Sequence, residues 1–286
     1  MISDEDSAAM KSPATITGTA VFGIFGKPVS HSLSPHMHRT AYRHMGIQAS
    51  YEAWHVDHPR DIIQRTRAED VRGASITMPF KEAVLGFLDE VDQTALAIGS
   101  VNTIHTDGGR LKGYNTDWIG LIRDLGGYLD IRGKSFAVIG AGGTARAAVF
   151  GILKCGGIPV ILNKTPSKGA ALAHALGCRA EPLEAITGVG SDVLINTTPV
   201  GMAPDVDKTP IKMTDLGRFK YVIDVIYNPI ETKLLRDAKA AGCTTINGVG
   251  MFVHQGAEQI RIWTGMDPPI GLMRQAVEAE LAIRSW

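Results

Sequence analysis

The chain has 286 residues, of which 44% are hydrophobic and 20% charged, a composition typical of a globular protein with about two domains. Its 29 basic and 29 acidic side chains give a formal net charge of zero, so no overall basic field attracts nucleic acid. No apolar run is long enough to span a bilayer, and the first residues lack the pattern of a signal peptide. Cys155, Cys178 and Cys243 have neither zinc-ligand nor redox spacing. We therefore expect a cytoplasmic protein with reduced cysteines. Its expected partners are small molecules, and its expected oligomeric state is a monomer or a homodimer.

The first half of the chain alternates short apolar runs with helical patterns. Strands are expected at residues 21–25, 50–56, 73–77 and 100–105. Between the first two, a helix is expected to begin at Ser34-Pro35 and to end near Gly46. The alternation predicts an α/β domain, which follows a loose polar tail over residues 1–19.

The second half contains apolar runs that are typical of buried parallel strands. These runs cover residues 136–139, 158–162, 193–196 and 221–225. Helical patterns separate them, so this part predicts a doubly wound, Rossmann-type domain over residues 118–250. Further helical patterns from residue 251 and over 270–283 are expected to return to the first domain, which would then comprise residues 20–117 and 251–286.

A glycine-rich turn follows the run 136–139 and opens a helical pattern. Gly140 suits the tight turn, Gly142 allows the backbone to approach a phosphate, and Ala145 is small enough for the helix to pack on the strand. The exposed N–H groups at the start of the helix would face the anion. The alternative is a glycine turn without a ligand. The predicted cofactor-binding turn consists of Gly140, Ala141, Gly142, Gly143, Thr144 and Ala145.

The type of cofactor is indicated at the end of the next strand, where an NAD-specific site normally places Asp or Glu. Asn163, Lys164 and Thr165 stand there instead, so no carboxylate is available for a ribose 2′-hydroxyl. Lys164 and Lys168 could receive a 2′-phosphate, which predicts NADP as the cofactor. Two solvated lysines without a ligand are the alternative.

Five further segments occur in a fixed order around this turn. They are residues 26–35 (GKPVSHSLSP), 75–81 (SITMPFK), 101–103 (VNT), 113–117 (GYNTD) and 248–255 (GVGMFVHQ). On these motifs the chain resembles the shikimate dehydrogenase family, which includes shikimate and quinate dehydrogenases, over nearly its whole length. Residues 196–202 and 251–255 look most like the dehydrogenase part of bifunctional dehydroquinate dehydratase–shikimate dehydrogenase.

The resemblance implies an NADP-linked interconversion of shikimate and 3-dehydroshikimate, on the route to aromatic amino acids. It implies that Lys81 and Asp117 are the catalytic pair. A carbonyl that accepts a hydride needs a proton on the nascent alkoxide, which an ammonium group can deliver. A solvated lysine and a helix N-cap are the alternative interpretations of these two residues.

The resemblance also implies a substrate site rich in neutral hydroxyl and amide groups, which suit a polyol with a carboxylate. Ser34 precedes Pro35 and could instead be a helix N-cap. Tyr227 follows a strand at the carboxyl edge of the sheet, and its alternative is half-buried packing. The implied substrate-binding residues are Ser32, Ser34, Thr77, Asn102, Asp117, Tyr227 and Gln255.

The family pattern adds two residues to the cofactor site. Val225 matches a position that packs against the cofactor, and Gly248 matches one near the nicotinamide. Either could be merely structural. Together with the turn, Asn163, Lys164, Thr165 and Lys168, they complete the implied NADP site.

Two other functions compete with this interpretation. A quinate dehydrogenase, or a dual quinate/shikimate enzyme that accepts NAD, would use nearly the same residues. A ligand-sensing homologue without turnover is an alternative of another class, although Lys81 and Asp117 are both present. The histidines between His31 and His58 lack a partnered Cys or carboxylate pattern, so no metal is predicted and surface histidines explain them.

Overall fold

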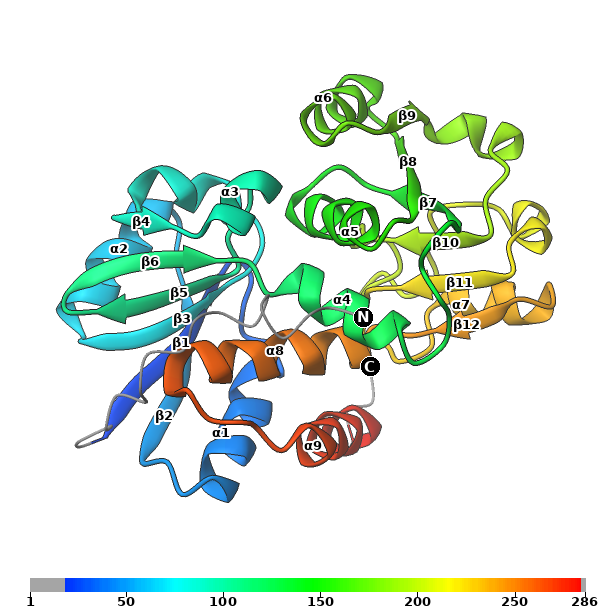
Figure 1. Cartoon of the computed structure of the whole chain (residues 1–286). Coiled ribbons are helices and arrows are strands. Elements are labelled where there is room, and N and C mark those ends of the chain that lie inside the picture. Colours follow the sequence, from blue (N-terminus) through cyan, green and yellow to red (C-terminus); the bar gives the residue numbers. More distant parts are fainter. Residues whose placement is uncertain (1–18, 284–286) are drawn as a thin grey trace. The chain divides into compact units, whose positions relative to one another are not determined.

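The computed structural model describes residues 19–283, so the predicted tail over residues 1–19 lies outside the described residues except for Thr19 (Figure 1). The chain divides into two compact units. The first contains the chain up to Thr116 together with Val253–Glu280, and the second contains Asp117–Phe252 together with the residues from Leu281. Each unit is built around its own sheet with helices, which confirms the prediction of two α/β units.

The first unit begins with a regular alternation of strands and helices. Its elements up to Thr116 are β1 (Ala20–Gly26), α1 (Ser34–His44), β2 (Ala49–His55), α2 (Pro59–Ala68), β3 (Val71–Ile76), the 3-10 helix η2 (Ala83–Phe87), β4 (Glu90–Val91), α3 (Gln93–Ile98), β5 (Thr103–Asp107) and β6 (Arg110–Tyr114). Two later helices follow the second unit in sequence: α8 (Val249–Thr264), which enters the first unit at Val253, and α9 (Ile270–Ile283).

The sheet of the first unit has the order β2-β1-β3-β5-β6-β4. β1 is parallel to both β2 and β3, because each connection between these strands is a helical crossover. β5 is antiparallel to β3, and β6 is antiparallel to β5. The sheet is therefore mixed, with a hairpin appended to a parallel core.

Both faces of this sheet are covered, and the side chains of β1 show the alternation. Phe25 faces the cluster that includes Ile62 of α2, and its ring lies 4.8 Å from that of Trp54. Phe22 points to the opposite face, where its ring lies 5.2 Å from those of Tyr42 and Trp263. α1 and α8 therefore cover the face opposite to α2 (Figure 1).

The second unit repeats the strand–helix alternation. Its elements are α4 (Asp117–Leu125), β7 (Ser135–Ile139), α5 (Gly143–Lys154), β8 (Ile158–Asn163), α6 (Pro166–Leu176), β9 (Arg179–Pro182), the 3-10 helix η3 (Leu183–Gly188), β10 (Val193–Asn196), the 3-10 helix η4 (Met213–Arg218), β11 (Tyr221–Asp224), α7 (Lys233–Ala240) and β12 (Thr244–Ile246).

All strand pairs of the second sheet are parallel, in the order β12-β11-β10-β7-β8-β9. The chain starts at β7, winds through β8 and β9, and then returns to the other side of β7 with β10. This reversal between β7 and β10 is the switch point at which open α/β sheets bind ligands. The predicted doubly wound topology is therefore confirmed, and the carboxyl ends of all its strands lie at one edge.

Most predicted elements are present, with shifts of a few residues. The predicted strand 193–196 and the predicted helix 270–283 have the bounds of β10 and α9. The predicted strand 100–105 begins later, at Thr103, because Asn102 precedes the ladder. No described helix is both long and apolar enough to cross a membrane.

Candidate active site

Chain direction explains why predicted substrate residues of the first unit gather at one edge of its sheet. β1 and β3 are parallel, so Ser32 and Thr77, which follow them, lie at their shared carboxyl edge. β5 is antiparallel to β3, so Asn102, which precedes β5, lies at this edge too, and its carbonyl accepts a hydrogen bond from the N–H of Ile76 (2.7 Å). From α8, Gln255 reaches the same place, where its Oε1 accepts a hydrogen bond from Asn102 Nδ2 (3.5 Å).

Ser32 and Ser34 lie at the start of α1. The Oγ of Ser32 accepts a hydrogen bond from the N–H of Ser34 (3.2 Å). Leu33 is the N-cap of α1 and its side chain makes no capping bond, so the interpretation of Ser34 as the N-cap is wrong. Ser34 is instead the first helical residue and is buried, whereas Ser32 is half-buried. Two hydroxyls beside a helix N-terminus suit a carboxylate.

Asn102 is held from several sides and is only 2% exposed. Its Oδ1 accepts hydrogen bonds from the N–H of Thr116 and from Thr103 Oγ1, both at 2.7 Å. Its Nδ2 donates to Thr116 Oγ1 at 2.9 Å. Because a backbone N–H can only donate, the Thr116 contact fixes which end of the carboxamide is the oxygen.

Lys81 lies in the turn between β3 and η2. Its carbonyl accepts a hydrogen bond from the N–H of Val101 (2.7 Å), the residue before Asn102, so the turn is joined to the polar edge. The Lys81 side chain is half-buried. Asp117 follows Thr116 directly, begins α4 in the second unit and is 4% exposed. The structure thus brings the backbone of Lys81 to this polar edge and places Asp117 at the start of the next unit.

Two buried rings support this edge from the core. His38 stacks on Tyr51 with ring centroids 4.2 Å apart, and its Nδ1 donates to the carbonyl of Ser34 (2.9 Å). Burial lowers the pKa of His38 to about 4, although the bond to Ser34 opposes the shift. Burial also raises the pKa of Tyr51 far above its ordinary value, against the hydroxyls of Ser75 and Ser34. The interpretation of the histidines as surface residues is therefore wrong for His38, which is fully buried.

In the second unit, the predicted glycine turn lies between β7 and α5. Gly140 has a φ of +123°, which side chains rarely adopt, and a Cβ there would lie 2.5 Å from Thr197 Oγ1. Gly142 is the exposed N-cap of α5, and apart from Gly142 and its two chain neighbours no described residue has an atom within 4 Å of the place where its Cβ would be. Ala145, in the first turn of α5, is buried, whereas Ala141, Gly143 and Thr144 are half-buried. The backbone of the turn is therefore open to a ligand.

The predicted 2′-phosphate site lies at the carboxyl end of the neighbouring strand β8. Asn163 is the last residue of β8, and its Nδ2 donates to the carbonyl of Thr165 (2.8 Å), which closes the loop before α6. Lys164, Thr165 and Lys168 are exposed. Within residues 19–283 neither lysine forms an ion pair, and no carboxylate stands in the loop. The loop therefore fits a phosphate better than a ribose hydroxyl.

Val225 and Gly248 lie close together at the carboxyl edge of the second sheet, where they follow β11 and β12. A Cβ on Gly248 would lie 2.2 Å from the Val225 carbonyl oxygen, so only glycine fits against this backbone. The N–H of Gly248 donates to the carbonyl of Ile226 (3.1 Å). Tyr227 also belongs to the second unit, where it is half-buried and its ring stacks on Phe252 at 4.2 Å.

Sequence reasoning missed several polar residues at these edges. Thr116 and Thr103 bind Asn102, and Gln259 lies one helical turn beyond Gln255 with 1% exposure. The four-residue spacing of the two glutamines on a predicted helix was a signal that could have indicated Gln259. Thr197, which follows β10 and contacts the glycine turn, could have been found from its place after a parallel strand.

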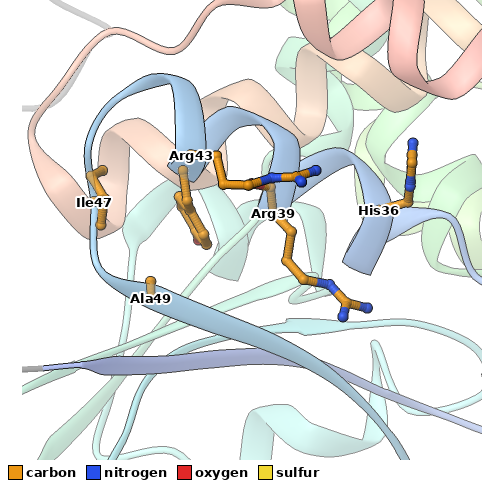
Figure 2. Close-up of a pocket in the computed structure, with 6 residues that line it drawn as sticks. His36, Arg39, Arg43, Ile47 and Ala49 are labelled. Carbon is orange, nitrogen blue, oxygen red and sulfur yellow. The ribbon is translucent and has the colours of Figure 1, made fainter.

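The first unit also has a hollow of about 440 Å³ beside the C-terminal half of α1. Its lining residues are His36, Arg39, Tyr42, Arg43, Ile47 and Ala49 (Figure 2). Figure 2 shows His36 and Arg39 pointing in opposite directions, so their side chains do not converge on one point. None of the predicted site residues lines this hollow.

One unit presents hydroxyl, carboxamide and ammonium groups at a sheet edge and the other presents a glycine turn with two lysines, which defines a dinucleotide-dependent oxidoreductase. Residues 24–104 match the family model of the shikimate dehydrogenase substrate binding domain, and residues 248–278 match that of the shikimate 5′-dehydrogenase C-terminal domain. A shikimate dehydrogenase (NADP(+)) of Pyrococcus abyssi is 42% identical over 257 residues, which cover 89% of this chain and 96% of that protein. The chain therefore belongs to the shikimate dehydrogenase family.

Solved structures agree with this assignment. A shikimate dehydrogenase crystallised with NADP+ is 37% identical, with a TM-score of 0.86 and coverage of 92% of this chain and 96% of the other. A shikimate 5-dehydrogenase of Thermus thermophilus, crystallised with NADP(H) and shikimate, is also 37% identical, with a TM-score of 0.83 and coverage of 91% and 99%.

These comparisons confirm the family, the fold class, the oxidoreductase activity and the use of NADP that the sequence predicted. They favour neither quinate nor a ligand sensor. The roles of individual residues stay predictions.

Proposed function

We propose that this protein interconverts shikimate and 3-dehydroshikimate with NADP, that residues 20–117 and 251–286 bind the substrate, and that residues 118–250 bind the cofactor. The observation that carries the proposal is the convergence of Ser32, Thr77, Asn102 and Gln255 at one sheet edge beside the Lys81 turn, in a chain of this family. That edge offers neutral donors and acceptors for a polyol and one ammonium group for proton transfer.

The substrate carboxylate is assigned to Ser32 and Ser34. Their hydroxyls stand beside the first N–H groups of α1, which carry the partial positive charge of the helix dipole. The ring hydroxyls are assigned to Thr77, Asn102 and Gln255, and Asp117 and Tyr227 complete the proposed set of substrate-binding residues. Hydroxyl and carboxamide groups both donate and accept, so they fit hydroxyls without a buried charge.

Lys81 is assigned the proton transfer. In the direction of reduction, its ammonium group donates a proton to the carbonyl oxygen of 3-dehydroshikimate as that oxygen becomes a hydroxyl. In the direction of oxidation, neutral Lys81 accepts the same proton from the hydroxyl at C3. Asp117 orients the ammonium group and the substrate hydroxyl. Proton transfer by a positioned group of this kind contributes about 10² to 10⁴ in rate.

The residues of the second unit fit NADP. The turn from Gly140 to Ala145 receives the pyrophosphate, because its backbone is open and α5 begins there. Asn163, Lys164, Thr165 and Lys168 receive the 2′-phosphate, and Val225 and Gly248 hold the nicotinamide end. When bound, the cofactor supplies or accepts the hydride at C3 of the substrate ring.

The test is a set of initial rates at high pH, with shikimate or quinate each paired with NADP+ or NAD+. Fast turnover with shikimate and NADP+ alone supports the proposal. Comparable or higher rates with quinate or NAD+ would change the assigned substrate or cofactor. Ligand binding without turnover in any pairing would indicate a ligand sensor and refute the enzymatic proposal.

We further propose a cytoplasmic location and a monomeric or homodimeric state. The first is supported by three cysteines that lack redox or zinc-ligand spacing. Sedimentation of the purified protein would decide the second.

A further inference from the structure

Gln259 stands at the centre of a buried hydrogen-bond chain that ends on Asn102. Its Nε2 donates to the carbonyl of Asn102 (3.2 Å) and to Thr103 Oγ1 (3.0 Å). Its Oε1 accepts from Ser75 Oγ (2.8 Å). Gln259 is 157 residues from Asn102 in the sequence, and these bonds join α8 to β3 and to the start of β5. None of Gln259, Ser75 and Thr103 belongs to the predicted site.

The direction of every bond in this chain is fixed by two backbone groups. The Asn102 carbonyl can only accept, so the nitrogen of Gln259 must face it and the oxygen of Gln259 must face Ser75. Thr103 Oγ1 accepts from Gln259 and therefore donates its one hydrogen to Asn102 Oδ1 (2.7 Å). At the far end the N–H of Thr116 can only donate to the same Oδ1. Both ends thus impose one orientation on the Asn102 carboxamide.

This chain of hydrogen bonds also extends into the core of the first unit. Ser75 donates its hydrogen to Gln259, so Tyr51 must donate to Ser75 Oγ across their 2.6 Å contact. Tyr51 stacks on His38, whose Nδ1 binds the carbonyl of Ser34. Every polar member of this chain is buried, so leaving one unpaired costs about 1 to 3 kcal/mol. These buried hydrogen bonds therefore restrict the motion of the side chains that they join, from Asn102 to the start of α1 at Ser34.

We propose that Gln259 is a positioning residue, which acts through Thr103 and Asn102 to present the Asn102 and Gln255 carboxamides to the substrate hydroxyls. This inference rests on the proposed function, because it takes Asn102 and Gln255 to contact shikimate. Gln259 itself is 1% exposed and binds the backbone carbonyl of Asn102, so the proposal assigns it no contact with the substrate.

A double-mutant cycle tests the proposal. Gln259→Met keeps the length of the side chain and removes its hydrogen bonds, and we expect kcat/KM for shikimate to fall about tenfold while the KM for NADP+ stays within about twofold. In an Asn102→Ala background, the same change should alter kcat/KM by less than about twofold, because the Asn102 carboxamide that Gln259 positions is absent. An equal loss in both backgrounds would overturn the proposal.

A matched control separates positioning from stability. Thr264 is another buried polar residue of α8, and its Oγ1 donates to the carbonyl of Ile260 without any bond to the Asn102 group. Thr264→Val should lower the melting temperature and leave kcat/KM for shikimate unchanged. If it lowers kcat/KM as much as Gln259→Met does, the effect of Gln259 is structural. Should Gln259→Met not fold, Thr103→Val breaks the chain one bond nearer to Asn102 and takes its place.

A measurement without turnover distinguishes this inference from the proposed function. The side-chain amide resonances of Asn102, identified by their loss in Asn102→Ala, should exchange slowly in the wild type and quickly in Gln259→Met. If they do while the wild type fails to oxidise shikimate, Gln259 positions Asn102 and the proposed substrate is wrong. If their exchange is unchanged in Gln259→Met, the positioning role is refuted whatever the activity.

Discussion

Lys81 is the residue on which the proposed proton transfer depends. We expect Lys81→Ala to lower kcat about 10³-fold, within the usual contribution of a positioned acid or base, and to change the KM for shikimate by less than about fivefold. The backbone bond from Val101 to Lys81 remains in the variant, so the turn keeps its place. Steady-state kinetics with NADP+ measures both constants.

The control for Lys81 is another lysine of the same unit. Lys112 lies on β6 and pairs with Glu90, away from the residues assigned to the substrate. Lys112→Ala should retain nearly the wild-type kcat, because exposed pairs of this kind contribute little to stability. A Lys81→Ala variant that turns over as fast as Lys112→Ala would remove Lys81 from the mechanism.

Lys164 and Lys168 should determine the choice of cofactor. In the double variant Lys164→Ala/Lys168→Ala we expect the KM for NADP+ to rise at least about tenfold, because hydrogen bonds to a charged phosphate contribute about 1.5 to 3 kcal/mol each. The KM for NAD+, which lacks this phosphate, should stay nearly constant. Lys220 is the matched control, since it is exposed and precedes β11 at the opposite edge of the sheet. If Lys220→Ala raised the KM for NADP+ equally, the two lysines would contribute only general charge.

His38 should make the protein sensitive to acid. Its pKa is about 4 in the folded state and about 6.5 when unfolded, so the unfolded chain binds more protons between these values. The resulting stability is fully present above pH 6.5 and is lost as the pH falls toward 4, by on the order of 3 kcal/mol. Urea unfolding between pH 7 and pH 4.5 should show a shallower pH dependence for His38→Asn than for the wild type. Equal slopes would contradict this account, whatever the absolute stability of the variant.

At the scale of elements, the packing of α8 on the sheet depends on a small residue in β3. A Cβ at Gly73 would lie 2.4 Å from Nε1 of Trp263, which donates to the carbonyl of Ile104 (2.9 Å). We expect Gly73→Ala to destabilise the fold by about 2 kcal/mol, because the indole must move. Denaturant unfolding measures the loss.

Gly86 provides the comparison for Gly73. No atom of the described residues lies within 4 Å of the place where its Cβ would be, and its φ is not in the left-handed region. Gly86→Ala should therefore be neutral or slightly stabilising, since alanine restricts the unfolded chain more than glycine does. Equal destabilisation by the two substitutions would mean that the contact between β3 and α8 is not tight.

Elements with strong local signals could be predicted from the sequence, and elements defined by their partners could not. The apolar run 193–196 and the helical pattern 270–283 match β10 and α9, because length and periodicity alone define them. The two-residue strand β4 and the start of β5 are defined by pairing with strands elsewhere in the chain, and no local pattern marks them. At Ser34 the local signal is strong but misleading. The sequence predicts that Ser34 is an N-cap, whereas α1 begins at Ser34 itself, one residue earlier than that prediction implies.

The candidate site shows the same division between local and distant information. The glycine turn at Gly140 could be predicted because a strand, a turn and a helix follow one another in the sequence. Asn102 and Gln255 could be grouped only through a family resemblance, since 153 residues separate them. The spacing of Gln255 and Gln259 could have placed both on one helix face, but nothing near Gln259 in the sequence shows that its partners would be Ser75, Asn102 and Thr103.

At the scale of the whole molecule, most of the residues assigned to shikimate lie in the first compact unit and those assigned to NADP lie in the second, so each ligand should protect a different sheet edge. Amide hydrogen exchange is expected to slow at residues 140–145 and 163–168 when NADP+ is added alone. Shikimate alone should slow exchange near residues 32–34, 76–81 and 101–103 instead. The physical reason is that a bound ligand stabilises the states in which its own contacts are formed. NAD+ at the same concentration is the control and should protect residues 163–168 less than NADP+ does, because it has no 2′-phosphate for Lys164 and Lys168. Protection of residues 101–103 by NADP+ alone, with none at 140–145, would show that the two units have been assigned the wrong ligands.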